Sequence, residues 1–391
     1  MPELPRIVVP LDLGHRAPPD GQAGARVVVG ATLAAVGREG ARTPPQATGE
    51  PGEAGELREI EVAGSMEAVL DLFESRRWTD GLPIVPPTPE RVTAMVAASR
   101  RRADEVLALL PPGHGAATVE KIAINAVMAG CRPEYMPVLL AAVEAMADPV
   151  FNLNAVQGST NPVAPLLIVN GPARHQLRFN SGYGCFGPGW RANATVGRAI
   201  RLILINVGGA LPGEKDMAVA GQPGKYTFCV AENEEESPWA PLHVERGFAR
   251  DTSVVTVVGV SSMINSLRAS PEELAEAATF RGSNDYRFGG CPLFALNPLA
   301  ARRQAEAGLD KPTLKRRIWE LSRKRVGDFP RSLLTPREDE LGSLDDPETI
   351  VTIARRPEDL LVMVAGAGGA GGHSIVMPSF GNTTPVSREI A

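Results

Sequence analysis

Several features that define other protein classes are missing from this 391-residue sequence. No apolar run reaches the ~18 residues that a membrane-spanning helix needs, and the first residues lack the charged-then-apolar pattern of a secretory signal. Only four cysteines occur, at positions 131, 185, 229 and 291, and no two of them form a CxxC pair. Free thiols without a signal sequence are typical of a reducing compartment. We therefore expect a cytoplasmic protein without membrane contact.

The sequence also carries little net charge. Its 45 acidic and 40 basic residues are interspersed and leave a formal charge of -5, so it has no basic footprint for a nucleic acid. One basic cluster, at residues 315–325, has helical spacing and is typical of a solvated helix face. The composition, with 43% hydrophobic and 22% charged residues, is that of an ordinary globular protein, and the length favours two domains.

The first 64 residues differ from the rest. Short β-type runs lie at 6–13 and 26–29, and the segment 37–58 is rich in glycine and proline. We interpret residues 1–64 as a β-rich extension with a Gly/Pro-rich linker. Residues 65–150 are expected to form a helical subdomain, with helices at 65–77, 88–101, 118–129 and 133–147.

Residues 151–391 alternate between strand and helix patterns. Continuous apolar runs suit strands that are covered on both faces, and such runs occur at 165–170, 226–231, 253–260, 291–296 and 360–365. Helices are expected at 193–207, 271–280, 298–308 and 313–326. The sequence therefore predicts an α/β fold with a mixed or mostly parallel sheet and helices on both faces, whose core domain at 151–391 contains the functional site.

Three of the expected strands run directly into a turn that contains glycine, at Gly171, Gly259 and Gly366. In open α/β sheets, ligands bind in the crevice outside the carboxyl ends of the strands. We therefore expect the functional site at these turns.

The first candidate for chemistry is the loop at 180–189, NSGYGCFGPG, which precedes an expected helix. Its glycines let backbone N–H groups approach a ligand, and the start of a helix favours an anion. We expect Cys185 to be a nucleophilic or redox thiol with a lowered pKa, and Arg191 to hold the anion. The alternative is a tight structural turn with an inert cysteine. The other residues of this loop that we assign to substrate binding are Asn180, Ser181, Gly184 and Gly187.

The second candidate is GAGGAGGH at 366–373. Gly366, Gly368 and Gly371 have the spacing of a dinucleotide-binding fingerprint, but the helix and the acidic strand end that such a site requires are missing. The sequence thus argues against an NAD site, and no cofactor is assigned. We interpret the segment as a loop that presents His373 and the backbone of Gly368 and Gly369 to a ligand.

The third candidate is the acidic segment that follows the strand at 226–231. Glu232 comes directly after the strand, and His243 and Glu245 alternate as strand neighbours would. We expect Glu232, His243 or His373 to act as a general acid or base. These residues together with Glu245 form an alternative, a carboxylate–histidine metal site, although no HExxH spacing supports it. A solvated acidic loop, with His243 bonded to a backbone carbonyl, is the interpretation without a function.

Two further stretches are weaker candidates. Residues 130–135 form an expected helix–helix corner, at which Cys131 and Arg132 would be exposed. The polar stretch at 157–162 precedes a buried strand and would line the same crevice. No G-x-S-x-G pattern supports a Ser–His–Asp triad.

Six motifs from residue 65 onward carry a family resemblance: WTDGLPIVPP at 78–87, GCRPEY at 130–135, NSGYGCFGPG at 180–189, AENE at 231–234, SPW at 237–239 and HVERG at 243–247. Taken together they resemble a widespread bacterial family of uncharacterised proteins. Its members look like companions of UGSC-type selenocysteine or cysteine proteins, which are similar to glycine-reductase components. The resemblance implies thiol or carbon–sulfur chemistry and a partner protein of the UGSC type, although this chain has no Cys-Gly-Ser-Cys motif.

The sequence therefore favours an enzyme that acts on a small anionic metabolite, a carboxylate or a sulfur compound, at the glycine-rich loop. A metal-dependent lyase or hydrolase that uses Glu232, His243, Glu245 and His373 is one alternative. A non-catalytic subunit that holds a ligand for a partner protein is another. We also expect a homo-oligomer, whereas the substrate and the reaction class are left open by the sequence.

Overall fold

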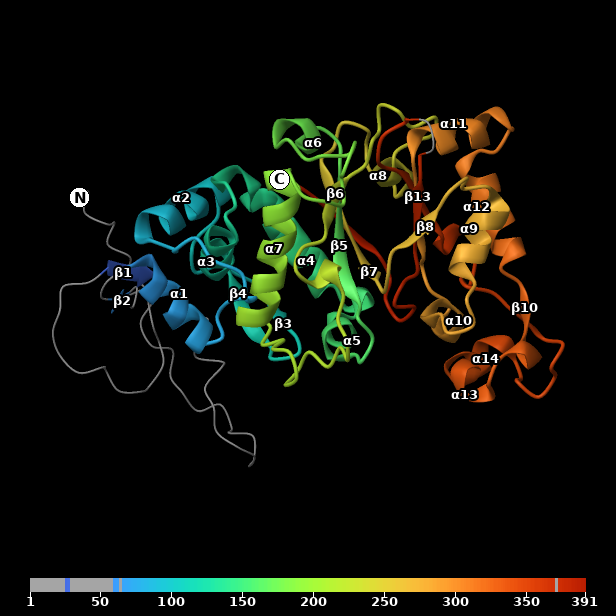
Figure 1. The fold of residues 1–391 in the computed structure, drawn as a ribbon, viewed down its shortest axis with the longest axis horizontal. Coiled ribbons are helices and arrows are strands. Elements are labelled where there is room, and N and C mark those ends of the chain that lie inside the picture. The colour runs from blue at the N-terminus through green and yellow to red at the C-terminus, as the bar shows by residue number, and fades with distance from the viewer. Residues whose placement is uncertain (1–24, 29–58, 63–64, 370–371) are drawn as a thin grey trace. The chain divides into compact units, whose positions relative to one another are not determined.

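The computed structural model describes residues 25–28, 59–62, 65–369 and 372–391. They form two compact units, whose helices and strands are labelled in Figure 1. Unit 1 contains the described residues up to Val143 and the segment Arg198–Lys215, and unit 2 contains Glu144–Gly197 and Asp216–Ala391. Residues 198–215 thus belong to unit 1 and not with the α/β core. The strand expected at 6–13 and the linker at 37–58 lie outside the described residues.

Unit 1 is mainly helical, as predicted. Its strands pair as two antiparallel hairpins, β1 (Ala25–Val28) with β2 (Glu59–Val62) and β3 (Val106–Leu110) with β4 (Gly115–Thr118). Its helices are α1 (Met66–Ser75), α2 (Pro89–Ser99), α3 (Val119–Ala129), most of α4 (Met136–Ala147) and the later turns of α7 (Arg191–Asn206). The sequence analysis did not predict the β3–β4 hairpin.

The ends of these helices follow from their capping residues. Thr88 Oγ1 accepts a hydrogen bond from Arg91 N while Pro89 begins α2, and Thr118 caps α3 in the same way. Helix α3 stops at Gly130, which takes the left-handed conformation with φ +87°. These boundaries confirm the sequence-based ones.

The motif at 78–87 is held by α7 within unit 1. Arg198 donates to both oxygens of Asp80 at 2.8 Å, and Asn206 Nδ2 donates to the carbonyl of Trp78 at 3.0 Å. Trp78 itself is buried, with its ring edge-on to Phe73. The motif therefore has a structural function in unit 1.

Among the described residues, no single helix has both the length and the apolar character to cross a membrane. The helical segments Pro133–Ala147 and Pro149–Gly158 reach that length and apolar character only when they are counted together, and a bend of 73° separates them.

Unit 2 contains two four-stranded mixed sheets, which confirms the predicted α/β class. The first has the strand order β14–β7–β5–β6, and the second has the order β12–β9–β13–β8. Their strands are β5 (Ala164–Asn170), β6 (Cys229–Ala231), β7 (Val254–Val260), β8 (Ile264–Ser266), β9 (Leu293–Leu296), β12 (Leu361–Val364), β13 (Ser374–Met377) and β14 (Val386–Glu389). Every residue of β5 and β7 is buried, as their continuous apolar runs predict.

Helices and one short strand pair complete unit 2. The helices are α5 (Leu153–Gly158), α6 (Ala173–Gln176), α8 (Leu242–Glu245), α9 (Pro271–Ala278), α10 (Asn284–Phe288), α11 (Pro298–Glu306), α12 (Lys311–Leu321), α13 (Arg331–Leu334) and α14 (Glu338–Leu341). β10 (Lys324–Arg325) pairs with β11 (Ile350–Val351). The side chains of Ser270, Asn297 and Asp310 cap α9, α11 and α12, so the predicted starts of α9 and α11 are confirmed.

The two sheets of unit 2 repeat one topology. In chain order, β5, β6, β7 and β8 correspond to β9, β12, β13 and β14. In each set the second strand is parallel to the first and the third is antiparallel to it. The fourth strands are exchanged, because β8 pairs with β13 and β14 pairs with β7. This pattern indicates an internal duplication with exchanged strands.

Hydrogen bonds at the strand ends support this correspondence. Glu232 N donates to the carbonyl of Val169, and in the second half Ala365 N donates to the carbonyl of Leu296. Each acceptor comes one residue before an asparagine. Asn170 and Asn297 are therefore equivalent, and Glu232 is equivalent to Ala365.

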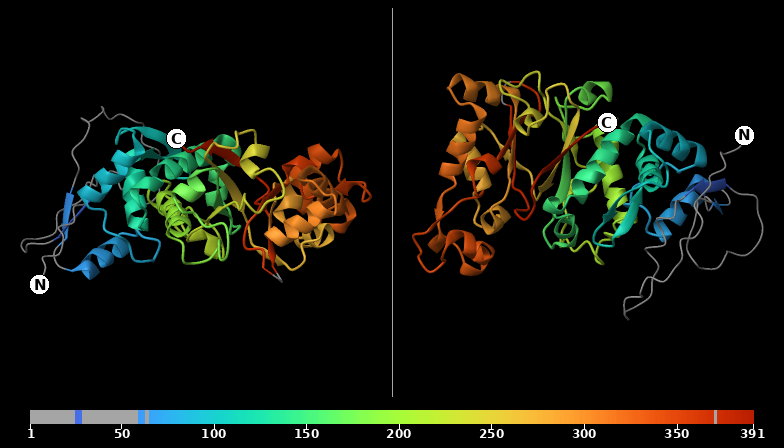
Figure 2. Two further views of the ribbon diagram at one scale, coloured as in Figure 1. Left: turned by 90° about the horizontal axis from the view of Figure 1, so that it is seen from above. Right: turned by 180° about the vertical axis from the view of Figure 1, so that it is seen from behind.

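The core of unit 2 lies on both faces of the second sheet. One face shares a core cluster with the first sheet, through side chains such as Leu166, Ile168, Leu293 and Met363. The other face packs against α9, α11 and α12, which lie together on one side of it (Figures 1 and 2). One sequence expectation is wrong here: β7 runs antiparallel to β5, so Gly259 lies at the opposite edge from Gly171.

Candidate functional site

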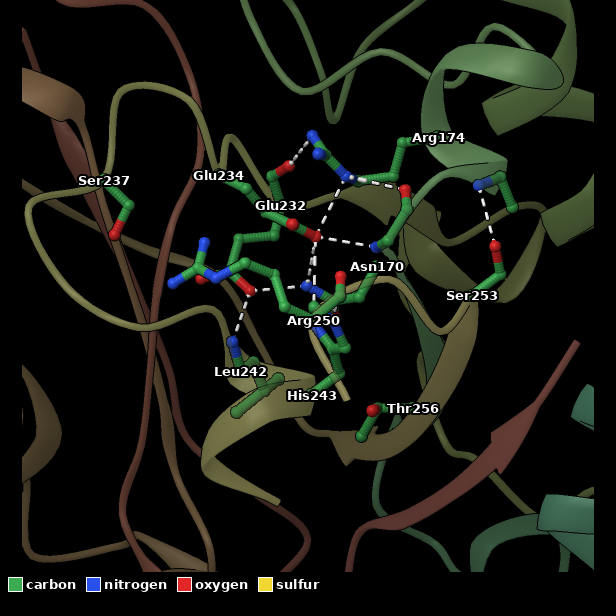
Figure 3. A network of polar contacts seen from close by, with 12 residues as sticks. Asn170, Arg174, Glu232, Glu234, Ser237, Leu242, His243, Arg250, Ser253 and Thr256 are labelled. Carbon is green, nitrogen blue, oxygen red and sulfur yellow. Dashed lines mark hydrogen bonds and ion pairs between the residues drawn. The ribbon is translucent and has the colours of Figure 1, made fainter. Parts of the chain in front are cut away.

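A buried network of polar side chains lies where β5 and β6 end (Figure 3). Asn170 is the last residue of β5, and Glu232 directly follows the parallel strand β6. Because parallel strands place their carboxyl ends at the same edge, the two side chains meet. Two strands that were predicted from their apolar runs therefore position the backbone of this site.

Glu232 is completely buried, with 0% of its surface exposed. Its Oε2 accepts hydrogen bonds from Asn170 Nδ2 at 2.6 Å and from Leu242 N at 2.7 Å. Burial raises the pKa of the Glu232 carboxyl above its usual range, and the ammonium of Lys311, 3.9 Å from Oε1, opposes this effect. Burial is the largest of these influences on the pKa of Glu232.

Glu234 is held as a carboxylate at the end of β5. Its Oε1 lies 2.8 Å from Gly171 N, 3.0 Å from Asn170 Nδ2 and 2.9 Å from Arg174 Nε. Gly171 has φ +74°, and a Cβ atom there would lie 2.2 Å from the carbonyl oxygen of Thr252. Only glycine fits this turn, which aims its N–H at the carboxylate.

Arg174 extends the network toward the surface. Its guanidinium donates to both carboxylate oxygens of Glu235, at 3.0 and 2.8 Å, and to the carbonyl of Glu232 at 2.9 Å. His175 Nε2 lies 2.8 Å from the same Glu235 carboxylate. The hydrogen bond from Arg174 is the largest of the influences that lower the pKa of Glu235 to about 2. A bidentate carboxylate site therefore already exists here, occupied by a half-exposed side chain of the protein.

His243 lies in α8 and is fully buried. Its Nε2 is 3.3 Å from the carbonyl oxygen of Arg250, and its Nδ1 is 3.8 Å from Glu234 Oε1. A carbonyl only accepts hydrogen bonds, so this geometry places a proton on Nε2, while Nδ1 lies near the carboxylate of Glu234. The expectation that His243 and Glu245 alternate on a strand is wrong, because both belong to a helical turn. The hydrogen bond to a backbone carbonyl is the one that the non-functional interpretation described.

Three polar atoms of this network are buried and have no hydrogen-bond partner among the described residues. They are Asn170 Oδ1, Glu232 Oε1 and His243 Nδ1. A buried polar group without a partner costs about 1–3 kcal/mol, and such groups are rare in folded proteins. Three such atoms lie together in this one network.

Two buried lysines of α12 adjoin the network. Lys311 and Lys315 are each 4% exposed and both contact the carboxylate of Glu245. Burial lowers the pKa of Lys315, and Glu245 opposes this. The prediction that the basic cluster at 315–325 is a solvated face is therefore wrong for Lys315, although Arg316, Arg317 and Arg323 are exposed.

The carboxylates of Glu234, Glu235 and Glu245 face the cations Arg174, Lys311 and Lys315. Arg246 is a further cation that interacts with Glu245. The network therefore combines several acidic side chains with at least as many basic ones.

The glycine-rich loop at 180–189 is held by Asn193 of α7. Asn193 Nδ2 donates to the carbonyls of Asn180 and Cys185, at 2.9 and 3.2 Å, while its Oδ1 accepts from Asn180 N at 2.8 Å. Cys185 is only 6% exposed, and burial raises its pKa to about 11. The expected lowering of this pKa is therefore wrong, because desolvation outweighs the nearby N–H groups.

The structure brings together the three segments that the sequence analysis placed around one site. Ala231 N donates to the carbonyl of Asn180 at 3.3 Å, and Gly366 N donates to the carbonyl of Ser181 at 2.7 Å. Asn233 Nδ2 lies 3.2 Å from the carbonyl oxygen of Gly366. The 180–189 loop, the end of β6 and the 366–369 loop are thus neighbours.

The remaining predicted residues lie as follows. Gly368 borders Arg302 and Glu236, and Gly369 borders the hydroxyl of the exposed Tyr183. Gly184 has φ +65° with open space at its Cβ position, and the N–H of Gly187 donates to the carbonyl of Gly184. Arg191 is the exposed first residue of α7. His373 is exposed, with Nδ1 2.7 Å from Asn265 Nδ2. Within the described part of the chain, no three His, Cys, Asp or Glu side chains are grouped to hold a metal ion. Glu232, His243, Glu245 and His373 therefore do not form the alternative metal site.

Cys131 was expected to be exposed at its helix–helix corner, but it is 8% exposed and lies in the core. Sequence reasoning missed Asn170, Glu234, Arg174, Lys311 and Lys315. The position of Asn170 at the end of an apolar strand is a signal for it, whereas the lysines resembled an ordinary exposed helix face.

Comparison with known proteins gives no assignment for this network. No protein-family model matches the chain, and no curated protein or solved structure is significantly similar to it. The function is therefore inferred from the chemistry of the residues described above.

Proposed function

We propose that the protein is an enzyme that acts on a small carboxylate by general acid–base catalysis, with Glu232 and His243 as the proton-transferring pair. The observation that carries this proposal is the set of three unpartnered buried atoms, Asn170 Oδ1, Glu232 Oε1 and His243 Nδ1. A donor, an acceptor and a hydrogen-bonding amide are the parts that a proton-transfer site needs.

The acid is Glu232. Both donors to this carboxyl group, Asn170 Nδ2 and Leu242 N, bond to Oε2. The proton of the neutral acid therefore resides on Oε1, the oxygen without a partner. A carboxyl group kept neutral by burial can donate this proton to a substrate at neutral pH.

The base is His243. The contact of Nε2 with the carbonyl of Arg250 leaves the lone pair on Nδ1, which faces no donor among the described residues. An imidazole held in one tautomer by a backbone carbonyl is a common general base. The acid and the base thus belong to one network, in which Glu232 carries the proton to be donated and His243 has the lone pair that accepts one.

The anionic group of the substrate has a binding mode already displayed by the protein. Arg174 and His175 hold the half-exposed carboxylate of Glu235, in a bidentate arrangement on the arginine. A substrate carboxylate can replace Glu235 on these two side chains. Residues 235–241 lie between the network and α8 without regular structure, so displacement of this part would open a path to Glu232.

The test is hydrogen–deuterium exchange into substrates. The protein is incubated in D2O with a panel of small carboxylic acids that carry an acidic C–H, and exchange at that carbon is followed by NMR. We expect exchange in at least one acid, reduced about 10²–10⁴-fold by Glu232→Gln and by His243→Asn. Glu236→Gln, which removes an exposed carboxylate from the same segment, is the matched control and should keep the activity.

Exchange by Glu232→Gln at the wild-type rate would contradict the proposal. So would the absence of exchange in every acid of the panel, since this is the behaviour of a ligand-holding subunit. The partner protein of the UGSC type and the homo-oligomer stay predictions of the sequence.

A further inference from the structure

A second polar site lies in the other half of the duplication, beside the start of α11. A cavity of about 160 Å³ opens there, and Arg268, Asn297, Leu299 and Arg303 line it. None of these residues belongs to the Glu232 network. Because a water molecule occupies about 30 Å³, the cavity has room for a phosphate ion or a short carboxylic acid.

The cavity is positively charged. Arg268 and Arg303 are exposed residues, and neither guanidinium has an ion-pair partner in the part of the chain that the structure describes. Two such groups around one small cavity repel each other unless an anion lies between them. Guanidinium groups match the oxygens of carboxylates and phosphates, to which they donate in pairs.

The backbone of α11 adds to this field. Asn297 Oδ1 accepts a hydrogen bond from Ala300 N at 3.0 Å, and Pro298 has no N–H to offer. The N–H of Leu299, which lines the cavity, has no acceptor within its own helix. It lies at the positive end of the helix dipole, where anions are stabilised.

An unpartnered buried hydroxyl supplies an independent sign of a ligand. Ser266 is 6% exposed, and its Oγ has no hydrogen-bond partner among the described residues. Ser266 pairs with Ser374 across β8 and β13, so their side chains share one face of the sheet. Ser374 Oγ accepts from the N–H of Asn297, which lines the cavity, at 3.1 Å, and Ser266 is followed in the chain by the lining residues Leu267 and Arg268.

In the first half of the duplication, a carboxylate of the protein itself is bound by a backbone N–H and an arginine. At the end of β5, the carboxylate of Glu234 binds Gly171 N and Arg174 Nε. Asn297 at the end of β9 is the equivalent of Asn170. The corresponding strand end in the second half thus has arginines and a free helix N–H beside a cavity.

We infer that this cavity binds the oxyanion group of a small metabolite, a phosphate or a carboxylate, between Arg268 and Arg303. The N–H of Leu299 and the hydroxyl of Ser266 are neutral donors without a partner among the described residues. The inference is independent of the proton transfer proposed for Glu232.

Isothermal titration calorimetry of the full chain with inorganic phosphate and, separately, with malonate tests the inference. We expect saturable binding of at least one of them. Arg268→Gln and Arg303→Gln should each weaken it roughly tenfold or more, because each removes a charge-assisted hydrogen bond. Arg323→Gln removes an exposed arginine of the same unit outside the cavity and should leave the affinity unchanged.

The outcome of the two titrations identifies the ligand class, since phosphate alone, malonate alone or both will bind. Equal affinities for wild type, Arg268→Gln and Arg303→Gln would overturn the inference, as would no saturable binding of either anion by wild type. Both arginines are exposed, so the variants are expected to fold, and their melting temperatures without ligand check this. Glu232→Gln should bind the anion as wild type does, which separates this test from that of the proposed function.

Discussion

Asn170 and Glu232 are 62 positions apart in the chain, and Asn170 Nδ2 donates to Glu232 Oε2 at 2.6 Å. Because this bond uses the amide nitrogen, Asn170 Oδ1 is left without a partner, and so is Glu232 Oε1. One hydrogen bond between two parallel strand ends thus fixes which atoms are available to a substrate.

Glu232→Gln should change the free energy of unfolding by no more than about 1 kcal/mol, because glutamine has the shape and hydrogen-bonding capacity of the protonated acid. Glu232→Ala should lower it by about 2–4 kcal/mol, since it leaves Leu242 N unpaired and creates a cavity. Chemical denaturation at neutral pH measures both. Equal losses in the two variants would show that the native carboxyl is ionised.

Asp285 gives the protein a pH-dependent stability. Its fully buried carboxyl accepts hydrogen bonds from Ser379 and Ser283, yet burial raises its pKa from 3.8 to about 7. The folded state holds this proton more tightly than the unfolded state. The protonated Asp285 therefore contributes its full share to the free energy of unfolding below pH 3.8, and this contribution is lost as the pH rises through about 7. The loss is at most about 4 kcal/mol.

Asp285→Asn should therefore become more stable relative to wild type as the pH rises from about 4 to about 8. Urea unfolding across this range measures the difference. Asp251→Asn, at an exposed position, is the control and should give a flat difference. A flat difference for Asp285→Asn as well would mean that its pKa is not raised.

Cys185 should react slowly with an alkylating reagent in the native protein at neutral pH, because burial raises its pKa to about 11. Cys291, whose pKa burial raises to about 12, should be slower still. Peptide mass spectrometry of the alkylated protein reads each site. Rapid, selective reaction of Cys185 at neutral pH would restore the thiol chemistry expected from the sequence.

Gly171→Ala should destabilise the protein by about 3 kcal/mol or more, because the new Cβ would lie 2.2 Å from the carbonyl oxygen of Thr252. Gly184→Ala should cost about 1–2 kcal/mol, since its positive φ is strained for alanine but its Cβ position is open. Thermal unfolding distinguishes the two. Similar losses at both positions would mean that the turn at Gly171 relaxes.

Much of the fold could be predicted from the sequence where one physical signal dominates. The apolar runs of β5 and β7 and the proline-plus-cap starts of α2, α9 and α11 were correctly placed. Strands β8, β13 and β14 were missed because polar residues such as Ser374 and Arg388 interrupt them. In addition, β8 and β14 pair with strands of the other half, which no local sequence pattern records.

The candidate site was predicted only in part. Glu232 was identified from its position after a strand and His243 from its spacing to Glu245, but the side chains that they contact come from other segments. Lys315 is the clearest case: its helix has the spacing of a solvated face, yet tertiary packing buries the side chain against Glu245. Cys185 failed in the opposite way, because a glycine-rich loop suggested exposure and the fold gives burial.

The most direct test of the account is the infrared spectrum of the native protein at neutral pH, compared with that of Glu232→Gln. A protonated carboxyl group has a carbonyl band that an ionised carboxylate lacks, and Asp285→Asn removes the contribution of the other carboxyl among the described residues that is 0% exposed. The account predicts, in the Asp285→Asn background, a protonated-carboxyl band at neutral pH that disappears when Glu232→Gln is added. If the band is absent before that change, Glu232 is ionised and cannot be the proton donor.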